Sequence, residues 1–406
     1  MDNSSPAQLQ NQLAMDTTEV ATRLAAVCDL IEEHRKSGAP ICATRAAAIS
    51  AMIDDVAAAA ATGGTRMDSG ACSYEAVDGD DELGVGLSGF VVRARLRATG
   101  EDVAVKSLHA EPGGGGIARL LREACFMAAC GGHPSLVALR GVAMDDAGDG
   151  GHSLVMDYVG PNLLDVLRAR GGRRPFPEAD ARRVMRQLLA GAVAMHRHGI
   201  VHRDIKPENV LVAATGCGGV VKICDLGSAK STAERSPPAD IAGTMEYMAP
   251  EVLARSACGH GVPADAWSLG CVMAELLTGE PPFRGEDQAD QLREIFDVLG
   301  APEESVWEAM RPRVSAVLAS EVKQWRARQR QVRHRSRLRE VIPGEVLSDE
   351  GFEVLKGLLT CDPEKRMTAA AALRCAWFAD EVEEDARVPV AATSSAGCAM
   401  SLAITA

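Results

Sequence analysis

Three glycines followed by a strand-like run place the strongest constraint on how this chain can fold. Gly84, Gly86 and Gly89 lie within six residues, and such glycines let backbone amides approach phosphate groups without a Cβ in the way. The same spacing occurs in dinucleotide sites, where the glycines open a helix. Here Gly89 continues into alternating residues 90–95, which are typical of a strand. The sequence therefore predicts a β-hairpin flap over a nucleotide and argues against a dinucleotide enzyme.

A lysine follows the flap on a second predicted strand. Residues 102–106 form a short run rich in β-branched and small apolar residues, and Lys106 ends it. We expect Lys106 to reach the nucleotide phosphates and to be held by an acidic residue. Glu123, on a helix predicted for residues 117–129, is the natural partner, and Glu111 is the alternative.

Residues 201–209 combine an acid, a cation and an amide at fixed offsets. This set matches the requirements of phosphoryl transfer from ATP to a hydroxyl. Asp204 can accept the proton of the attacking hydroxyl, Lys206 can neutralise the transferred group and Asn209 can hold a magnesium ion. Asp225 follows a predicted strand at 220–223 and would be the second magnesium ligand. An isolated Asp-Leu-Gly is usually a turn, but the two upstream motifs favour the metal role.

Composition divides the chain into a central domain and two flanking segments. The first segment is rich in alanine, and runs at 20–31 and 45–61 have helical character. It predicts a partly helical or disordered extension, with an amphipathic docking helix as the alternative. The predicted units are 1–73 (extension), 74–159 and 160–378 (a β-rich and a helical part of one domain, 74–378) and 379–406 (a flexible tail).

Charge and cysteine content exclude several classes of protein. The net charge of −13 argues against direct nucleic-acid binding and against binding to anionic membranes. Twelve cysteines occur without a Cys-x-x-Cys pair, which indicates reduced thiols in a cytoplasmic or nuclear protein. The sequence shows no secretory signal and no apolar run of the roughly 18 residues that a membrane span needs.

Three further motifs follow in order, at 243–251, 265–270 and 361–366. With them, residues 74–378 resemble a eukaryotic-type protein kinase. The resemblance implies an α+β bilobal fold, with a β-rich N-lobe, a helical C-lobe, and ATP and Mg²⁺ between them. It also implies a buried spine and a buried ion pair that stabilise the lobes. The spine residues would be Met127, Leu139, His202 and Leu226, and the pair Glu251 and Arg366.

The resemblance assigns roles to individual site residues. The catalytic set would be Lys106, Glu123, Asp204, Lys206 and Thr244, and the metal ligands Asn209 and Asp225. The nucleotide-binding set would be Leu83, Gly84, Gly86, Gly89, Val91, Ala104, Lys106, Met156, Asp157, Val159 and Leu211, with adenine held by the backbone of Asp157 and Val159.

The chain also resembles a particular class of kinase. Lys206 together with Thr244 is similar to the serine/threonine class, which implies protein substrates with serine or threonine targets. Residues 283–285 and 290–300, followed by Trp307, resemble the CMGC group and its cyclin-dependent kinases, including the plant F class. A pseudokinase scaffold is the alternative, but it would lack lysine or metal-ligand positions that are all filled here.

Several positions depart from the cyclin-dependent pattern. Residues 115–123 keep little of the cyclin-binding helix signature, which argues against cyclin dependence and leaves other regulatory partners open. Ala239 stands where the activating threonine would align, and Asp240 could supply a fixed negative charge to Arg203. Nearby candidates for phosphorylation are Ser231, Thr232 and Ser236.

Two positions bear on substrate choice, and one region remains open. Met248 replaces an arginine that supports proline-directed specificity, whereas Glu208 resembles kinases that favour basic residues before the target. Residues 323–339 hold eight lysines and arginines. This run predicts either a nuclear-import or docking surface, or a solvated helix face that offsets an acidic protein.

Overall fold

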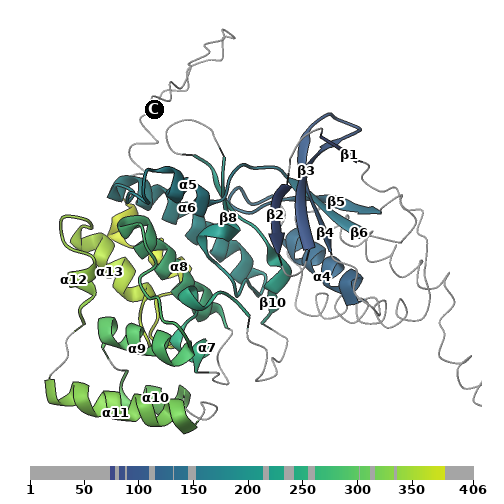
Figure 1. Cartoon of the computed structure of the whole chain (residues 1–406). Helices are drawn as coiled ribbons and strands as arrows, with labels where there is room; N and C mark the ends of the chain where they lie inside the picture. Colours follow the sequence, from purple (N-terminus) through teal and green to yellow (C-terminus); the bar gives the residue numbers. More distant parts are fainter. Residues whose placement is uncertain are drawn as a thin grey trace, which may run out of the picture.

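The chain folds into two lobes, a smaller one built on a β-sheet and a larger one built of helices (Figure 1). The computed structural model describes residues 74–77, 82–86, 89–108, 115–130, 132–144, 152–213, 219–232, 242–254, 261–300, 302–310, 316–332 and 336–379. The predicted helices at 20–31 and 45–61, the tail after 379, and Ser236, Ala239 and Asp240 lie outside these residues.

The small lobe contains an antiparallel sheet in the order β1-β3-β4-β6-β5, with β2 paired to β3. Its strands are β1 (Tyr74–Ala76), β2 (Glu82–Gly86), β3 (Gly89–Leu96), β4 (Asp102–Leu108), β5 (Leu139–Met144) and β6 (His152–Asp157). The β2–β3 hairpin is the predicted flap, and Gly86 pairs with Gly89 at its end. The glycines therefore lead into a strand and not into a helix.

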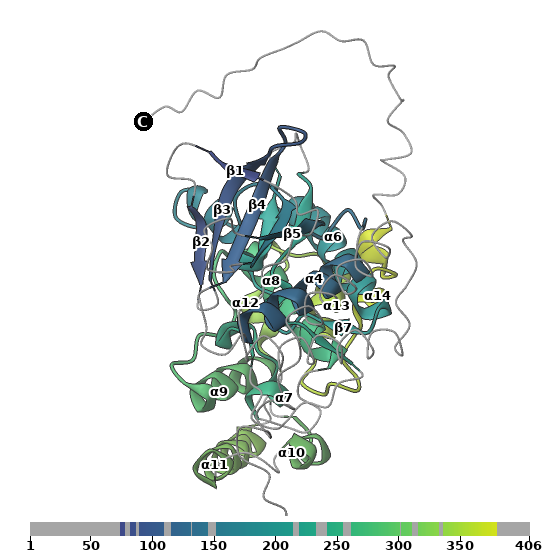
Figure 2. The ribbon, with the colours of Figure 1, turned by 90° about the vertical axis from the view of Figure 1, so that its right-hand side faces the viewer.

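Strand β4 separates two apolar layers, because successive side chains of a strand point to opposite faces of the sheet. Val103 and Val105 are buried in a cluster on one face. Ala104 and Lys106 are buried on the other. Helix α4 (Gly115–Ala129) packs on this second face, beneath the sheet in Figure 2. Because Lys106 lies in the layer between strand and helix, it faces the acidic residue that α4 carries.

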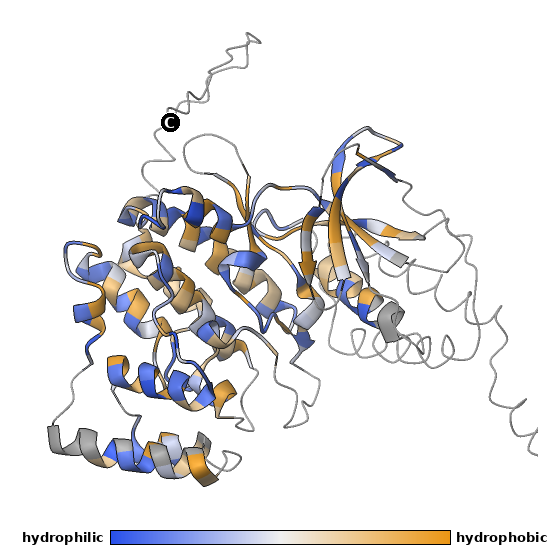
Figure 3. Cartoon of the chain, in the orientation of Figure 1, coloured by the Kyte–Doolittle hydropathy of each residue, from blue (hydrophilic) through white to orange (hydrophobic). Residues whose placement is uncertain are grey.

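The large lobe is organised around α8 (Val262–Thr278), in which every residue from Ala264 to Leu277 is buried. A helix that is buried all round is expected at the centre of a lobe. Helix α6 (Glu178–Arg197) packs against α8. Its buried residues Ala181, Met185 and Leu188 form one stripe, and Figure 3 shows polar residues on the outer sides of the surrounding helices. The other helices are α5 (Leu163–Ala169), α7 (Pro250–Leu253), α9 (Gln288–Leu299), α10 (Glu304–Met310), α11 (Ala316–Val332), α12 (Leu338–Val341), α13 (Asp349–Leu358) and α14 (Ala369–Ala372).

Short strands and turns carry the loops between the lobes. Strand β7 (Ile200–Val201) pairs with β10 (Lys230–Ser231), and β8 (Val210–Val212) pairs with β9 (Val221–Ile223). The loop 202–209 runs from β7 to β8, and Asp225 follows β9. The 3₁₀ turns are η1 (Pro207–Asn209), η2 (Leu226–Ser228), η3 (Met245–Tyr247) and η5 (Ala376–Phe378).

Helices α10 and α11 lie at the end of the molecule opposite the sheet (Figures 1 and 2). The arginine-rich run begins in α11, and part of it stabilises the lobe itself. Arg326 is buried and binds Glu304 at 3.0 Å and the carbonyl of Pro302. Arg337 binds Glu340 at 2.8 Å, and Arg339 binds Asp349 and the carbonyl of Leu347. Neither predicted role for this run included such internal contacts. None of the described helices combines the length and apolar composition needed to cross a membrane.

Candidate active site

An ion cluster, buried at Lys106 and Glu123 and partly exposed at Asp225, joins the two lobes. Nζ of Lys106 lies 2.9 Å from both carboxylate oxygens of Glu123 and 2.7 Å from Oδ1 of Asp225. Lys106 and Glu123 are 8% and 3% exposed. The structure thus pairs Lys106 with Glu123, the first of the two candidates, whereas Glu111 lies outside the described residues.

The cluster favours the charged forms of Lys106 and Asp225. Burial alone would lower the pKa of Lys106, but the carboxylates of Glu123 and Asp225 outweigh it and raise that pKa above its ordinary value. Burial would likewise raise the pKa of Asp225, but Lys106 holds it below its usual range. The lysine therefore stays cationic and Asp225 anionic at neutral pH. A Cβ at Gly227 would lie 3.1 to 3.3 Å from atoms of all three pairing side chains, so a larger residue would require these side chains to shift by a few tenths of an ångström.

Asp204 lies at the centre of a second polar cluster. The hydroxyl of Thr244 donates to its Oδ1 at 2.9 Å, and Nζ of Lys206 donates to that hydroxyl at 2.7 Å and lies 3.0 Å from Oδ2. Thr244 reaches the loop 202–209 because its neighbour Gly243 packs closely against that loop. Gly243 has φ +112°, and a Cβ there would lie 2.5 Å from the carbonyl oxygen of Arg203. The structure thus brings together three of the residues predicted to act on a hydroxyl group.

Asn209 and Asp225 are brought together by the β8–β9 hairpin. The amide of Cys224 donates to the carbonyl of Asn209 at 3.0 Å, so Asp225 follows directly beside it. The side-chain nitrogen of Asn209 donates to Asp204, which leaves its oxygen available for a cation. The described residues contain no group of three or more His, Cys, Asp or Glu side chains that could hold a metal ion. The pair fits Mg²⁺, which usually takes one or two protein oxygens and completes its shell with phosphates and water.

Asp265 of α8 holds the start of the loop 202–209, which carries Asp204 and which we call the catalytic loop. The Asp265 carboxylate accepts the backbone N–H groups of His202 and Arg203, both at 2.9 Å, and contacts His196 Nε2 at 2.9 Å. The amide of Asp204 donates to Nδ1 of His202, so Nε2 carries the proton and donates to the carbonyl of Cys224 at 2.9 Å. This loop conformation requires left-handed backbone at a residue other than glycine, since Arg203 has φ +71°.

The predicted adenine-side residues lie where the two lobes meet. Ala104 pairs with Met156 across β4 and β6, and both are buried. Val91, Val159 and Leu211 are partly buried against the same core cluster. The backbone N–H of Asp157 donates to the carbonyl oxygen of Ala138. Of the backbone N–H and carbonyl of Asp157, only the carbonyl therefore remains to bind a ligand.

The flap above this region is more open. Leu83 is 42% exposed, and Val85 is 64% exposed. A Cβ added at Gly84 would meet no atom within 4 Å. Internal packing therefore does not explain the glycine at this position, whereas space for a phosphate-bearing ligand does.

Two structural features implied by the resemblance are also present. The spine residues Met127, Leu139, His202 and Leu226 are all buried. Arg366 binds Glu251 through two bonds of 2.6 and 2.8 Å and also donates to the carbonyl of Pro263. Both side chains are almost completely buried. Removing one partner of such a buried pair destabilises a protein by about 3–5 kcal/mol.

Sequence reasoning missed several residues that shape the site. Asp265 was identified only as part of a motif, and its three contacts could not be read from the chain. Gly227 and Gly243 were identified only as motif positions, and their close approach to the ion cluster and to Arg203 was not foreseen. Signals for these roles exist only in three dimensions, because the partners lie 17 to 119 positions apart for Lys106 and more than 60 for Asp265.

Comparison with known proteins places the chain in a family. Residues 78–378 match the protein kinase domain family. The chain is 45% identical over 321 residues to "Putative cyclin-dependent kinase F-2" of Oryza sativa subsp. japonica, which covers 77% of this chain and 93% of that protein. It is 34% identical to cyclin-dependent kinase G1 of Arabidopsis thaliana and 32% identical to cyclin-dependent kinase 11.1 of Caenorhabditis elegans.

The matches differ in how much of each relative they span. They cover 73% and 76% of this chain but only 48% of the Arabidopsis protein and 41% of the nematode protein. The chain therefore spans less than half the length of these two relatives. The chain belongs to the protein kinase family, as a serine/threonine-type member of the cyclin-dependent-kinase-like CMGC group.

Proposed function

We propose that this protein is an active kinase that transfers the γ-phosphoryl group of ATP, with Mg²⁺, to serine or threonine hydroxyls of other proteins. The observation that carries the proposal is the contact of Asp204 with both Lys206 and Thr244. The Lys106 cluster supports it, because a pseudokinase has no need to keep the lysine, its acidic partner and the metal-loop aspartate in mutual contact.

The residues divide the reaction between them. Lys106 would hold the α- and β-phosphates, and the flap amides would cover them. Bound magnesium, held by Asn209 and Asp225, would offset the charge of the phosphates. Asp204 would accept the hydroxyl proton as the substrate oxygen bonds to the γ-phosphorus, and the bridging oxygen would leave with its electron pair on ADP. Lys206 would neutralise the charge on the transferred group, because positioned charge supplies most of the catalysis in this chemistry.

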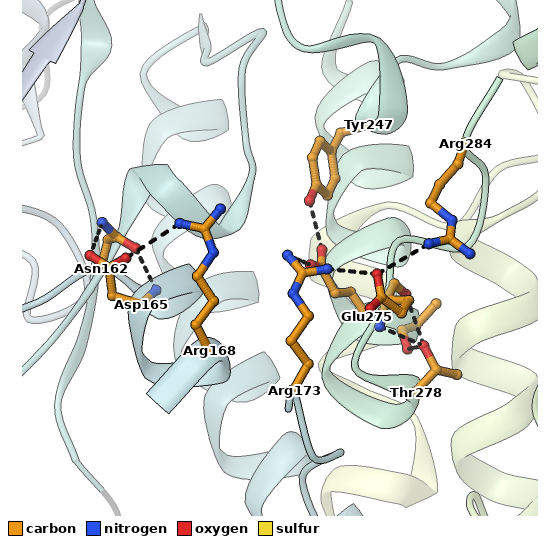
Figure 4. A network of polar contacts seen from close by, with 10 residues as sticks. Asn162, Asp165, Arg168, Arg173, Tyr247, Glu275, Thr278 and Arg284 are labelled. Carbon is orange, nitrogen blue, oxygen red and sulfur yellow. Dashed lines mark hydrogen bonds and ion pairs between the residues drawn. The ribbon is translucent and has the colours of Figure 1, made fainter. Parts of the chain in front are cut away.

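We propose that substrates carry a basic residue before the target. Glu208 is exposed and makes no ion pair among the described residues. Near it, Glu275 is wholly buried and accepts the hydroxyl proton of Tyr247 at 2.6 Å, as Figure 4 shows. Burial, together with the charges of Glu208 and Glu280, raises the pKa of Glu275 to about 7, against the lowering effects of the Tyr247 hydrogen bond and of Arg173. An arriving guanidinium would relieve this excess of negative charge.

A pocket beside the catalytic loop supports a target context without strict proline direction. It is lined by Asp204, Thr244, Tyr247 and Met248, among others. Met248 packs against the core where proline-directed relatives would place an arginine. We propose that the enzyme acts in the cytoplasm or nucleus, that residues 74–378 form its catalytic domain, and that no cyclin is required.

The test is phosphotransfer by the full chain to a basic peptide and a proline-directed peptide. Asp204→Asn should lower kcat by about a hundredfold or more, since general-base catalysis alone contributes this much. Asp165→Asn, in the exposed first turn of α5, serves as the control. Unchanged phosphotransfer by Asp204→Asn would contradict the mechanism. Nucleotide binding without any transfer by the unmutated protein would instead identify a pseudokinase.

A further inference from the structure

Three charged side chains meet at the junction between the lobes. Nε of Arg140, on β5, donates to Oδ1 of Asp157 at 2.5 Å, and Nζ of Lys222, on β9, donates to Oδ2 at 3.1 Å. We call Arg140, Asp157 and Lys222 the hinge triad. Its two cations bind different oxygens of one carboxylate and belong to different lobes. The carboxylate joins the small-lobe sheet to the strand that leads into Asp225.

The triad is better sheltered than a typical surface ion pair. The side chains of Asp157 and Lys222 are 15% and 19% exposed, whereas that of Arg140 is 45% exposed. Charge-assisted hydrogen bonds in such partly buried positions are stronger than exposed pairs, many of which contribute nothing measurable. We therefore expect the bond between Lys222 and Asp157 to contribute most of the stabilisation that the triad provides.

Backbone hydrogen bonds connect the same elements. The N–H of Ile223 donates to Ser135 at 2.9 Å, and the N–H of Val137 donates to Ile223 at 3.0 Å. The N–H of Asp157 donates to Ala138 at 3.0 Å. The segment between α4 and β5 is thus bonded to β9 on one side and, on the other, to Asp157 at the junction between the lobes. Because α4 carries Glu123 and β9 precedes Asp225, these bonds link the two acidic partners of Lys106.

We propose that the hinge triad positions the lobes at the angle at which Lys106, Glu123 and Asp225 meet. This inference rests on the proposed function, since it explains how the ATP site is held ready. Gly160 follows Asp157 closely and has φ +152°, a conformation that marks the chain turn into the large lobe. When only a fraction of molecules is aligned, the apparent affinity for the ligand falls to that fraction of its intrinsic value. The triad therefore acts on nucleotide affinity and leaves the chemical step unchanged.

The experiment removes each cation separately in the full chain. Lys222→Met and Arg140→Gln should raise KM for ATP and Kd for ADP, by about threefold to tenfold for Lys222→Met and by less for Arg140→Gln. At saturating ATP, kcat should stay within about twofold, because the nucleotide itself then restores the aligned state. Lys222→Arg, which keeps a cationic donor, should recover most of the affinity.

Two matched controls separate this role from general effects of lost charge. Lys356→Met breaks an exposed pair with Glu353, and Arg95→Gln breaks one with Asp102. Both should leave KM and Kd unchanged. The proposal is overturned if the triad variants do the same, if the controls shift equally, or if kcat rises at constant KM, which would mean that the triad restrains the enzyme.

Amide hydrogen exchange gives a readout that does not depend on activity. Without nucleotide, Lys222→Met should speed exchange at Val137, Asp157 and Ile223, and the controls should not. If the unmutated protein neither binds nor transfers phosphate, the proposed function fails, but faster exchange in this variant would still support the positioning role. Unchanged exchange would overturn that role.

Discussion

At the scale of single residues, Glu275 shows how burial in the fold disfavours a charge. Its side chain is fully buried, and Oε1 makes no hydrogen bond. Tyr247 donates to the other oxygen, and Arg173 lies 3.8 Å away (Figure 4). Burial raises the pKa of this carboxyl to about 7. The folded protein therefore holds a proton that the unfolded chain releases at lower pH.

This difference makes stability depend on pH. Below pH 4.5, the pKa of Glu275 in the unfolded chain, this carboxyl is protonated in both the folded and the unfolded state. Its ionisation then does not lower the free energy of unfolding. As pH rises toward 7 the unfolded chain ionises first, and stability falls by up to about 3 kcal/mol. Glu275→Gln keeps an acceptor for Tyr247 and removes the dependence. Urea unfolding at pH 5 and pH 8 should show the variant gaining on the unmutated protein at pH 8.

The control for this prediction is Glu353→Gln, an exposed carboxylate on α13. Its stability should follow that of the unmutated protein at both pH values. If Glu275→Gln also runs parallel to the unmutated protein, then Glu275 is ionised in the fold and the raised pKa is wrong.

At the scale of elements, α8 acts as the support of the catalytic loop. Asp265 lies in its first turn and accepts two loop N–H groups with one carboxylate. Asp265→Asn would place an NH₂ group where an acceptor is needed. We expect a loss of about 2 kcal/mol in stability and a fall in kcat at least tenfold larger than the change in KM, because Asp204 follows in the same loop. Thermal unfolding and steady-state kinetics measure both.

Asp287→Asn provides the comparison, since Asp287 also accepts two backbone N–H groups, but at the exposed start of α9. Asparagine caps helices about as well as aspartate, so stability and kcat should hardly change. Equal effects of the two substitutions would show that Asp265 only caps its surroundings.

The elements also show what the sequence could predict. The alternation in β3, the run ending at Lys106 and the helix carrying Glu123 followed from local patterns, and the structure places them within two residues of their expected bounds. The ion pair between Glu251 and Arg366 followed from the family resemblance. The hinge triad and the contacts of Asp265 did not, because they join residues from separate elements and carry no local periodicity. Orientation across the hinge is a property of packing that no sequence window contains.

At the scale of the whole molecule, one ligand would bind both lobes. A nucleotide held by the flap and by Lys106 on one side and by Asn209 and Asp225 on the other should stabilise the fold. At a hundredfold excess over Kd, Mg²⁺·ADP should add about 2.7 kcal/mol to the free energy of unfolding. Thermal shift assays with and without EDTA measure this increment. The metal-dependent part should disappear in Asp225→Asn, and its persistence would contradict the assigned ligand.

The left-handed backbone at Arg203 and Asp225 has a consequence for the resting state. Each has positive φ without being glycine, and such conformations cost about 1–3 kcal/mol unless neighbours enforce them. Asp265, Lys106 and Gly227 supply that enforcement here. Intrinsic backbone preference therefore pulls both residues toward other conformations. Loosening one of these contacts would therefore let the backbone at Arg203 or Asp225 leave the left-handed region, without a ligand having to force it out.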